Sequence, residues 1–187
     1  HGWLLVAAIF SYPTLLSQSI HAATQDTDQS RLGKVEFPTS CNEKSQPMLD
    51  QGLALLHHMT YVKARATFEA VIEKEPDCAM AYWGVAMSIV HPLWSDPPNE
   101  ENFAKGLTMI EKAKVKGTKT KRELAYIKAI DNYYAQGRKE KETDNLVAFE
   151  QGWAKVHDAF PSDPEATAFY ALSLLGTASP ADKSYRN

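Results

Sequence analysis

The sequence predicts an all-α fold of stacked antiparallel helix hairpins. Apolar residues recur at helical spacing, first at Leu49, Leu53 and Leu56. Proline and glycine end the apolar segments. The pattern repeats after 34 positions, because Gly52 corresponds to Ala86, a second small residue. One hairpin of such an array leaves an apolar side open, and we expect the next hairpin to cover it.

The predicted helices follow one another along the chain with one longer break. The segment "HPLWSDPPNEE" at 91–101 places three prolines where a tight turn would lie in a regular repeat. Elsewhere the breaks are short, and about three and a half hairpins are expected. The predicted helical segments are 46–59, one that ends before Pro76, one near 82–89, and 99–117, 121–136, 144–160 and 165–175.

Four residues of the first pair fall at the spacing of the tetratricopeptide pattern. In that pattern a glycine in the first helix and an A-x3-F in the second helix precede a closing proline. Gly52, Ala64, Phe68 and Pro76 occupy these positions. Small residues let the two helices of a pair approach closely, and the aromatic ring fills the wedge between them.

The segments "FPTSC", "GLALLHH", "DCAMAYWGVAM" and "HPLW" occur in this order. Together they resemble a largely uncharacterised family of exported bacterial tetratricopeptide-repeat proteins, and the resemblance covers roughly residues 35–187. It implies a tetratricopeptide-like α-α superhelix. Longer members carry further histidine-bearing repeats, so we expect this chain to be a fragment. Met48, Gln51 and Leu55 depart from the aromatic, leucine and tyrosine positions of the general repeat, which affects the expected packing of the first helix.

The first residues of the chain predict a secretory signal peptide. An almost wholly apolar run is followed by small polar residues, with Ile20 and Ala22 at the −3 and −1 positions of a signal-peptidase site. Pro13 interrupts the run too early for a membrane span, and none is expected after cleavage. We therefore expect a periplasmic or secreted protein. Its predicted parts are a signal peptide at 1–22, a linker at 23–40 and the repeat domain at 41–187.

Cys41 and Cys78 are the only two cysteines. An even cysteine count in an oxidising compartment favours a structural disulfide. The two positions differ by close to one repeat, so we expect them at the starts of neighbouring repeats and bonded to each other. The chain has no CxxC spacing, which excludes zinc-finger chemistry on ligand count.

Composition and motifs narrow the function to three classes. A net charge of −3 and a pI near 6.1 give no basic surface for nucleic acid. The favoured class is a scaffold that binds a protein or peptide in the concave groove of the repeats. The alternative is a binder of a divalent metal such as copper, or of a small ligand. An enzyme is not expected, because G-x-S-x-G, H-E-x-x-H and phosphate-loop motifs are missing.

His57 and His91 lie 34 positions apart and so occupy equivalent places in neighbouring first helices. We expect both to face the groove, close enough to converge on one ion or one carboxylate. Met80 and Met87 lie on the same stripe and could add soft copper ligands, although thioethers more often fill gaps in a core. The candidate groove and ligand residues are Leu53, His57, Met80, Trp83, Met87, His91 and Trp94, with His57 and His91 as the candidate metal ligands.

Less specific roles stay open for these residues. Trp83 and Trp94 could form an aromatic platform, yet tryptophan on repeat helices is more often part of the core. Each histidine could simply bond a backbone carbonyl. The last predicted helix has no following partner in this sequence, so Phe169, Leu172 and Leu175 are expected to form an exposed apolar patch.

Overall fold

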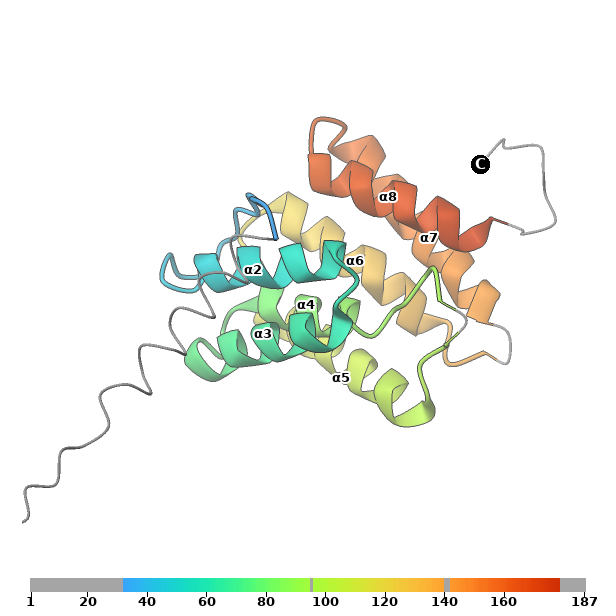
Figure 1. Ribbon diagram of the computed structural model, residues 1–187, viewed down its shortest axis with the longest axis horizontal. Helices are drawn as coiled ribbons and strands as arrows, with labels where there is room; N and C mark the ends of the chain where they lie inside the picture. The colour runs from blue at the N-terminus through green and yellow to red at the C-terminus, as the bar shows by residue number, and fades with distance from the viewer. Residues whose placement is uncertain (1–31, 95, 140–141, 179–187) are drawn as a thin grey trace, which may run out of the picture. The chain divides into compact units, whose positions relative to one another are not determined.

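The computed structural model describes residues 32–94, 96–139 and 142–178, so the predicted signal peptide at 1–22 lies outside the described residues (Figure 1). The described part contains seven α-helices and no β-strand, which confirms the all-α prediction. None of these helices is long and apolar enough to cross a membrane. The helices are α2 (Gln46–His57), α3 (Tyr61–Lys74), α4 (Ala79–Met87), α5 (Glu100–Lys116), α6 (Lys121–Ala135), α7 (Glu142–Ala159) and α8 (Pro164–Thr177).

Helices that are consecutive in the sequence pack against each other, from α2 with α3 through to α7 with α8 (Figure 1). Several helix starts follow from local sequence. Asn99, Thr120 and Asp163 each accept a hydrogen bond from a backbone N–H of the helix that they precede. Gly117 ends α5 with φ 70°, a conformation that glycine adopts without strain. The predicted helix bounds therefore agree with the structure to within a few residues.

Small residues allow the first three helices to enclose the Phe68 ring of α3. A Cβ atom added at Gly52 of α2 would lie 2.7 Å from this ring, and one added at Gly84 of α4 would overlap it as well. The ring is fully buried. The helices approach closely because glycine stands at both positions, which is the role expected for Gly52 from the repeat pattern.

Trp83 of α4 lies at the centre of the core. Its ring centroid is 5.4 Å from that of Phe37, 5.7 Å from Tyr126 on α6 and 6.0 Å from Phe169 on α8. Phe169 also stacks on Trp153 of α7 at 4.6 Å and is buried. The prediction that Phe169 is exposed is therefore wrong. Leu175, further along α8, is exposed as expected.

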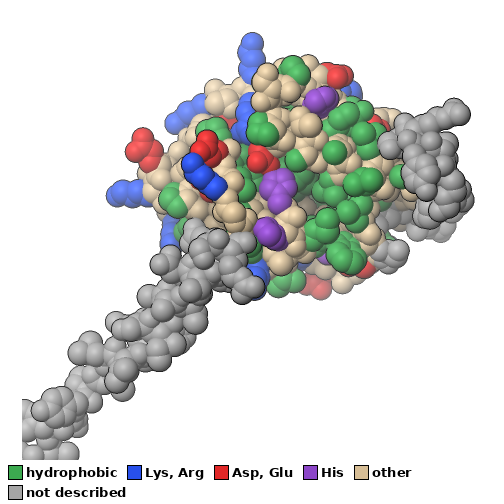
Figure 2. Space-filling model, turned by 45° about the horizontal axis from the view of Figure 1, so that its top comes forward, with side chains coloured by type: hydrophobic (Ala, Val, Ile, Leu, Met, Phe, Trp, Pro, Cys, Tyr) green, Lys and Arg blue, Asp and Glu red, His purple; other side chains and the backbone are tan. Residues whose placement is uncertain are grey.

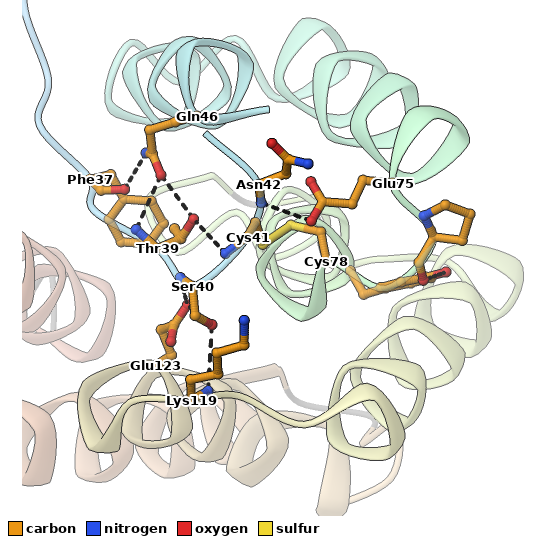
Figure 3. The surroundings of a disulfide bond; sticks show 12 residues. Phe37, Thr39, Ser40, Cys41, Asn42, Gln46, Glu75, Cys78, Lys119 and Glu123 are labelled. Carbon is orange, nitrogen blue, oxygen red and sulfur yellow. Dashed lines mark hydrogen bonds between the residues drawn. A yellow bond between two sulfur atoms is a disulfide. The ribbon is translucent and has the colours of Figure 1, made fainter. Parts of the chain in front are cut away.

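The segment before α2 is part of the domain. The compact unit that holds all seven helices begins at Lys34, within the predicted linker at 23–40. Phe37 is fully buried, and its backbone N–H and carbonyl bond to the side chains of Asp50 and Gln46. Ser40 donates two hydrogen bonds to Glu123 of α6 (Figure 3). The end of the predicted linker thus belongs to the core, because Phe37 covers Trp83.

A disulfide joins Cys41, directly after this segment, to Cys78 at the start of α4, and it confirms the predicted pair (Figure 3). The Cα atoms are 5.1 Å apart. Asn42 adds a hydrogen bond from its backbone N–H to Glu75, which precedes Cys78 by three positions. The bond therefore fixes the segment before α2 to the turn between α3 and α4.

Replacing both cysteines with serine should lower the free energy of unfolding by about 4 kcal/mol, because the bond closes a loop with a sequence separation of 37. Urea unfolding measures this difference. Reductant should lower the stability of the wild-type protein and leave that of the double variant unchanged. Equal stability of the two proteins under oxidising conditions would show that the bond does not stabilise the fold.

An ion pair fixes the start of α8 to α6. The Arg122 Nε lies 2.5 Å from Asp163 Oδ2, and the hydroxyl of Tyr126 donates to the same oxygen at 2.9 Å. Burial alone would raise the pKa of the Asp163 carboxyl, but the hydrogen bonds from Arg122 and Tyr126 outweigh it and lower that pKa. The Arg122 guanidinium also lies over the Phe37 ring, 4.9 Å from its centroid.

Replacing Asp163 with asparagine should destabilise the protein by about 2 kcal/mol at neutral pH, the typical loss for a hydrogen bond to a charged group. A carboxyl with a lowered folded-state pKa stabilises the fold above its unfolded pKa of about 3.9. That contribution disappears as the pH falls through the folded-state pKa. Chemical unfolding at several pH values should therefore show the two proteins converging below about pH 4. A difference that is independent of pH would contradict the role of the Asp163 charge.

Candidate functional site

Four of the predicted groove residues lie in the core. Leu53, Met80, Trp83 and Met87 are buried, together with every other residue of α4. Aromatic rings from the segment before α2, from α6 and from α8 surround Trp83. This burial corrects the expectation that these side chains line an open groove.

His57 and His91 do not share a ligand. The Nε2 of His57 lies 2.5 Å from Glu165 Oε2 on α8, and its ring stacks on Phe169 at 5.2 Å. The Nδ1 of His91 lies 3.0 Å from Asp96 Oδ2. Each imidazole therefore has its own carboxylate, which corrects the expectation that the two converge on one. Figure 2 shows histidine side chains on one face of the molecule, beside an area of hydrophobic side chains.

His91 and Trp94, two of the predicted residues, line a shallow open depression of about 320 Å³. We name it the His91 depression. One side comes from the turn between α2 and α3 and the first turn of α3, and the other comes from the loop between α4 and α5. Its lining residues are Met59, Thr60, Tyr61, Val62, Lys63, His91, Trp94 and Asp96.

Aromatic stacking and a carboxylate fix the orientation of His91. Its ring stacks on Tyr61, with 4.1 Å between the ring centroids. An ionised carboxylate can only accept hydrogen bonds, so Nδ1 of His91 donates its proton to Asp96. In the neutral imidazole Nε2 is then a hydrogen-bond acceptor.

Two polar atoms of the His91 depression are buried without a hydrogen-bond partner among the described residues. They are Nε2 of His91 and the hydroxyl oxygen of Tyr61. Burial raises the pKa of the Tyr61 hydroxyl. The nearby Trp94 indole makes no regular hydrogen bond with it but partly offsets this rise in pKa. The charge of Asp96 raises the pKa further. Unpaired buried polar atoms are costly in a stable fold. Both atoms are almost inaccessible to solvent, so they lie beneath the surface of the depression.

Exposed apolar side chains flank the same atoms. Trp94 is 53% exposed and Val62 is 79% exposed. Tryptophan combines a large apolar surface with a hydrogen-bond donor, and it is enriched where proteins bind one another. The depression therefore offers exposed apolar surface to a ligand, beside the exposed carboxylate of Asp96.

Met59 lies in the turn that forms one wall of the depression. Its φ of 55° lies in the left-handed region, and it is the one described residue other than glycine with a positive φ. Its backbone N–H bonds to Leu56, and that of Thr60 bonds to Leu55, as in a Schellman helix end where glycine is usual. A residue other than glycine in this conformation adds strain, and strain of this kind is concentrated at functional sites.

The Met59→Gly protein should be more stable than Met59→Ala by about 1 kcal/mol, because both variants lose the methionine side chain but only glycine adopts a positive φ without strain. Thermal unfolding of the two proteins measures the difference. Equal stabilities would mean that the turn is not strained at this position.

Helical periodicity did not mark Met59, Tyr61 or Asp96 as site residues. Asp96 lies in the irregular loop, where no periodicity applies. The available signal was the clustering of His91, Trp94 and Asp96 within a proline-rich interruption of the repeat. Loops that interrupt a regular scaffold often carry function.

The metal alternative receives no specific support from the geometry. The described residues contain no group of three or more histidine, cysteine, aspartate or glutamate side chains that could hold a metal ion. Met80 and Met87, the predicted soft ligands, are buried away from the surface.

The chain was compared with family models, curated proteins and solved structures, and none of them matches it.

Proposed function

We propose that this protein is an exported scaffold of the tetratricopeptide type that binds a protein or peptide partner. The packing of consecutive helices in sequence order supports the architecture. The disulfide supports export, because such bonds are typical of an oxidising compartment such as the periplasm or the cell exterior. In this proposal the helices form a tetratricopeptide-like superhelix whose inner face is filled by Phe37 and Phe169.

The observation that carries the binding function is the His91 depression. It is open, it is flanked by the exposed side chains of Trp94 and Val62, and it contains two buried polar atoms without partners. A shallow site of this kind fits one or two side chains of a peptide with part of its backbone, rather than an enclosed small molecule. The proposed binding surface is therefore the edge of the hairpins and not the concave groove.

Catalysis is less well supported by the same geometry. A histidine oriented by a carboxylate also occurs in enzymes that activate a nucleophile. In the described part of the chain, however, no hydroxyl or thiol lies within hydrogen-bond distance of His91 Nε2. The site as described therefore suits binding better than nucleophilic catalysis.

Panning a random dodecapeptide phage library on the full chain tests the proposal. Selected peptides should bind with dissociation constants in the micromolar range, and Trp94→Ala should weaken them at least tenfold, as expected for an aromatic residue at the centre of an interface. Val62→Ser, which removes apolar surface without adding a charge, should weaken them as well. Val115→Ser is the matched control, since Val115 is 85% exposed on α5, outside the depression.

Binding that survives both Trp94→Ala and Val62→Ser would show that the peptide site lies elsewhere. A library that yields no binder to the wild-type protein would contradict the peptide-binding function itself. Circular dichroism of the three variants checks that each one is folded.

A further inference from the structure

The Asp96 carboxylate is an accessible acceptor in the His91 depression. It accepts the Nδ1 proton of His91, and because its side chain is 64% exposed it keeps free acceptor capacity. Nε2 of His91 and the Tyr61 hydroxyl are buried beneath the surface of the depression. A group bound here must therefore bring hydrogen-bond donors to the Asp96 oxygen atoms.

A cationic group satisfies these atoms best. The exposed ring of Trp94 lies beside Asp96, and an ammonium or guanidinium placed over an indole is attracted by its π-electrons. The exposed Asp96 carboxylate adds a negative charge to the lining of the depression. The whole chain carries a net charge of −3, which also favours a basic partner.

We propose that the His91 depression binds a lysine or arginine side chain of a peptide partner. The basic group lies over the Trp94 ring and donates hydrogen bonds to Asp96, while the stem of the side chain contacts Val62. The proposal rests on the peptide-binding function and adds the chemical class of the residue that is bound.

Two positive features of the rim oppose a cation. Lys63 lines the depression, and α3 begins there with the positive end of its dipole. The dipole acts only within the first turn and is screened by salt. The Asp96 carboxylate offsets both features, because its side chain is 64% exposed and the bound group contacts it directly.

The test uses the peptides selected by panning, in binding measurements by isothermal titration calorimetry. Each peptide should contain a lysine or arginine whose replacement by glutamine weakens binding about tenfold, the combined effect of a cation–π contact and charge-assisted hydrogen bonds. Asp96→Asn should cause a similar loss, because asparagine still accepts the Nδ1 proton but carries no charge. Asp77→Asn, at an 88% exposed aspartate that pairs with Lys116, is the matched control and should leave binding unchanged.

Charge removal at Lys63 separates the two electrostatic alternatives. Lys63→Gln should strengthen binding of a basic peptide by roughly two- to fivefold, the effect of removing one like charge at an exposed site. Weaker binding of this variant, or selected peptides that are acidic at their essential position, would overturn the cation proposal while leaving the peptide-binding function intact.

A second measurement tests the site without any selected peptide. Titration of arginine amide into the isotope-labelled full chain should shift the NMR signal of the Trp94 indole N–H. Citrulline amide, which has nearly the same shape without the charge, should shift it about tenfold less at equal concentration. Equal shifts from the two compounds, or none from arginine amide, would contradict the proposal even if the library yields binders.

Discussion

The packing of aromatic rings around Trp83 is the interaction on which the rest of the structure depends. Trp83 lies on α4, every residue of which is buried. Its neighbours come from the segment before α2, from α6 and from α8, so one indole joins parts of the chain that are far apart in sequence. Aromatic side chains bury more apolar area than any others, and tilted and edge-to-face pairs such as these add to that stabilisation.

This centre makes the domain more closed than a simple repeat array. In a solenoid each repeat contacts only its neighbours. Here Glu123 of α6 holds Ser40, and Glu165 of α8 holds His57 of α2, so the first and last described helices are directly bonded. The chain's own aromatic side chains surround Trp83, so the proposed binding surface lies at the edge of the hairpins instead of in a groove.

Periodicity was sufficient to predict the helices, and position in the repeat was sufficient to predict the disulfide. The helix prediction depends on local spacing, and the disulfide prediction depends on a separation of about one repeat. A single sequence contains both kinds of information. The burial of Leu53, Met80, Trp83 and Met87 could not be predicted in this way. It depends on Phe37, assigned to a linker, and on Phe169, assigned to an open end. Such long-range contacts leave no periodic signal near the residues that they cover.

The two histidines show how the same repeat position acquires different roles. Each imidazole has a carboxylate partner and stacks on an aromatic ring. The Glu165 side chain beside His57 is only 12% exposed, so that pair joins two helices within the domain. Asp96 lies in the loop that interrupts the repeat, and this loop leaves its carboxylate open to solvent. Because a charge must be accessible to recognise another molecule, the proposed peptide site uses the pair formed by His91 and Asp96 rather than the pair formed by His57 and Glu165.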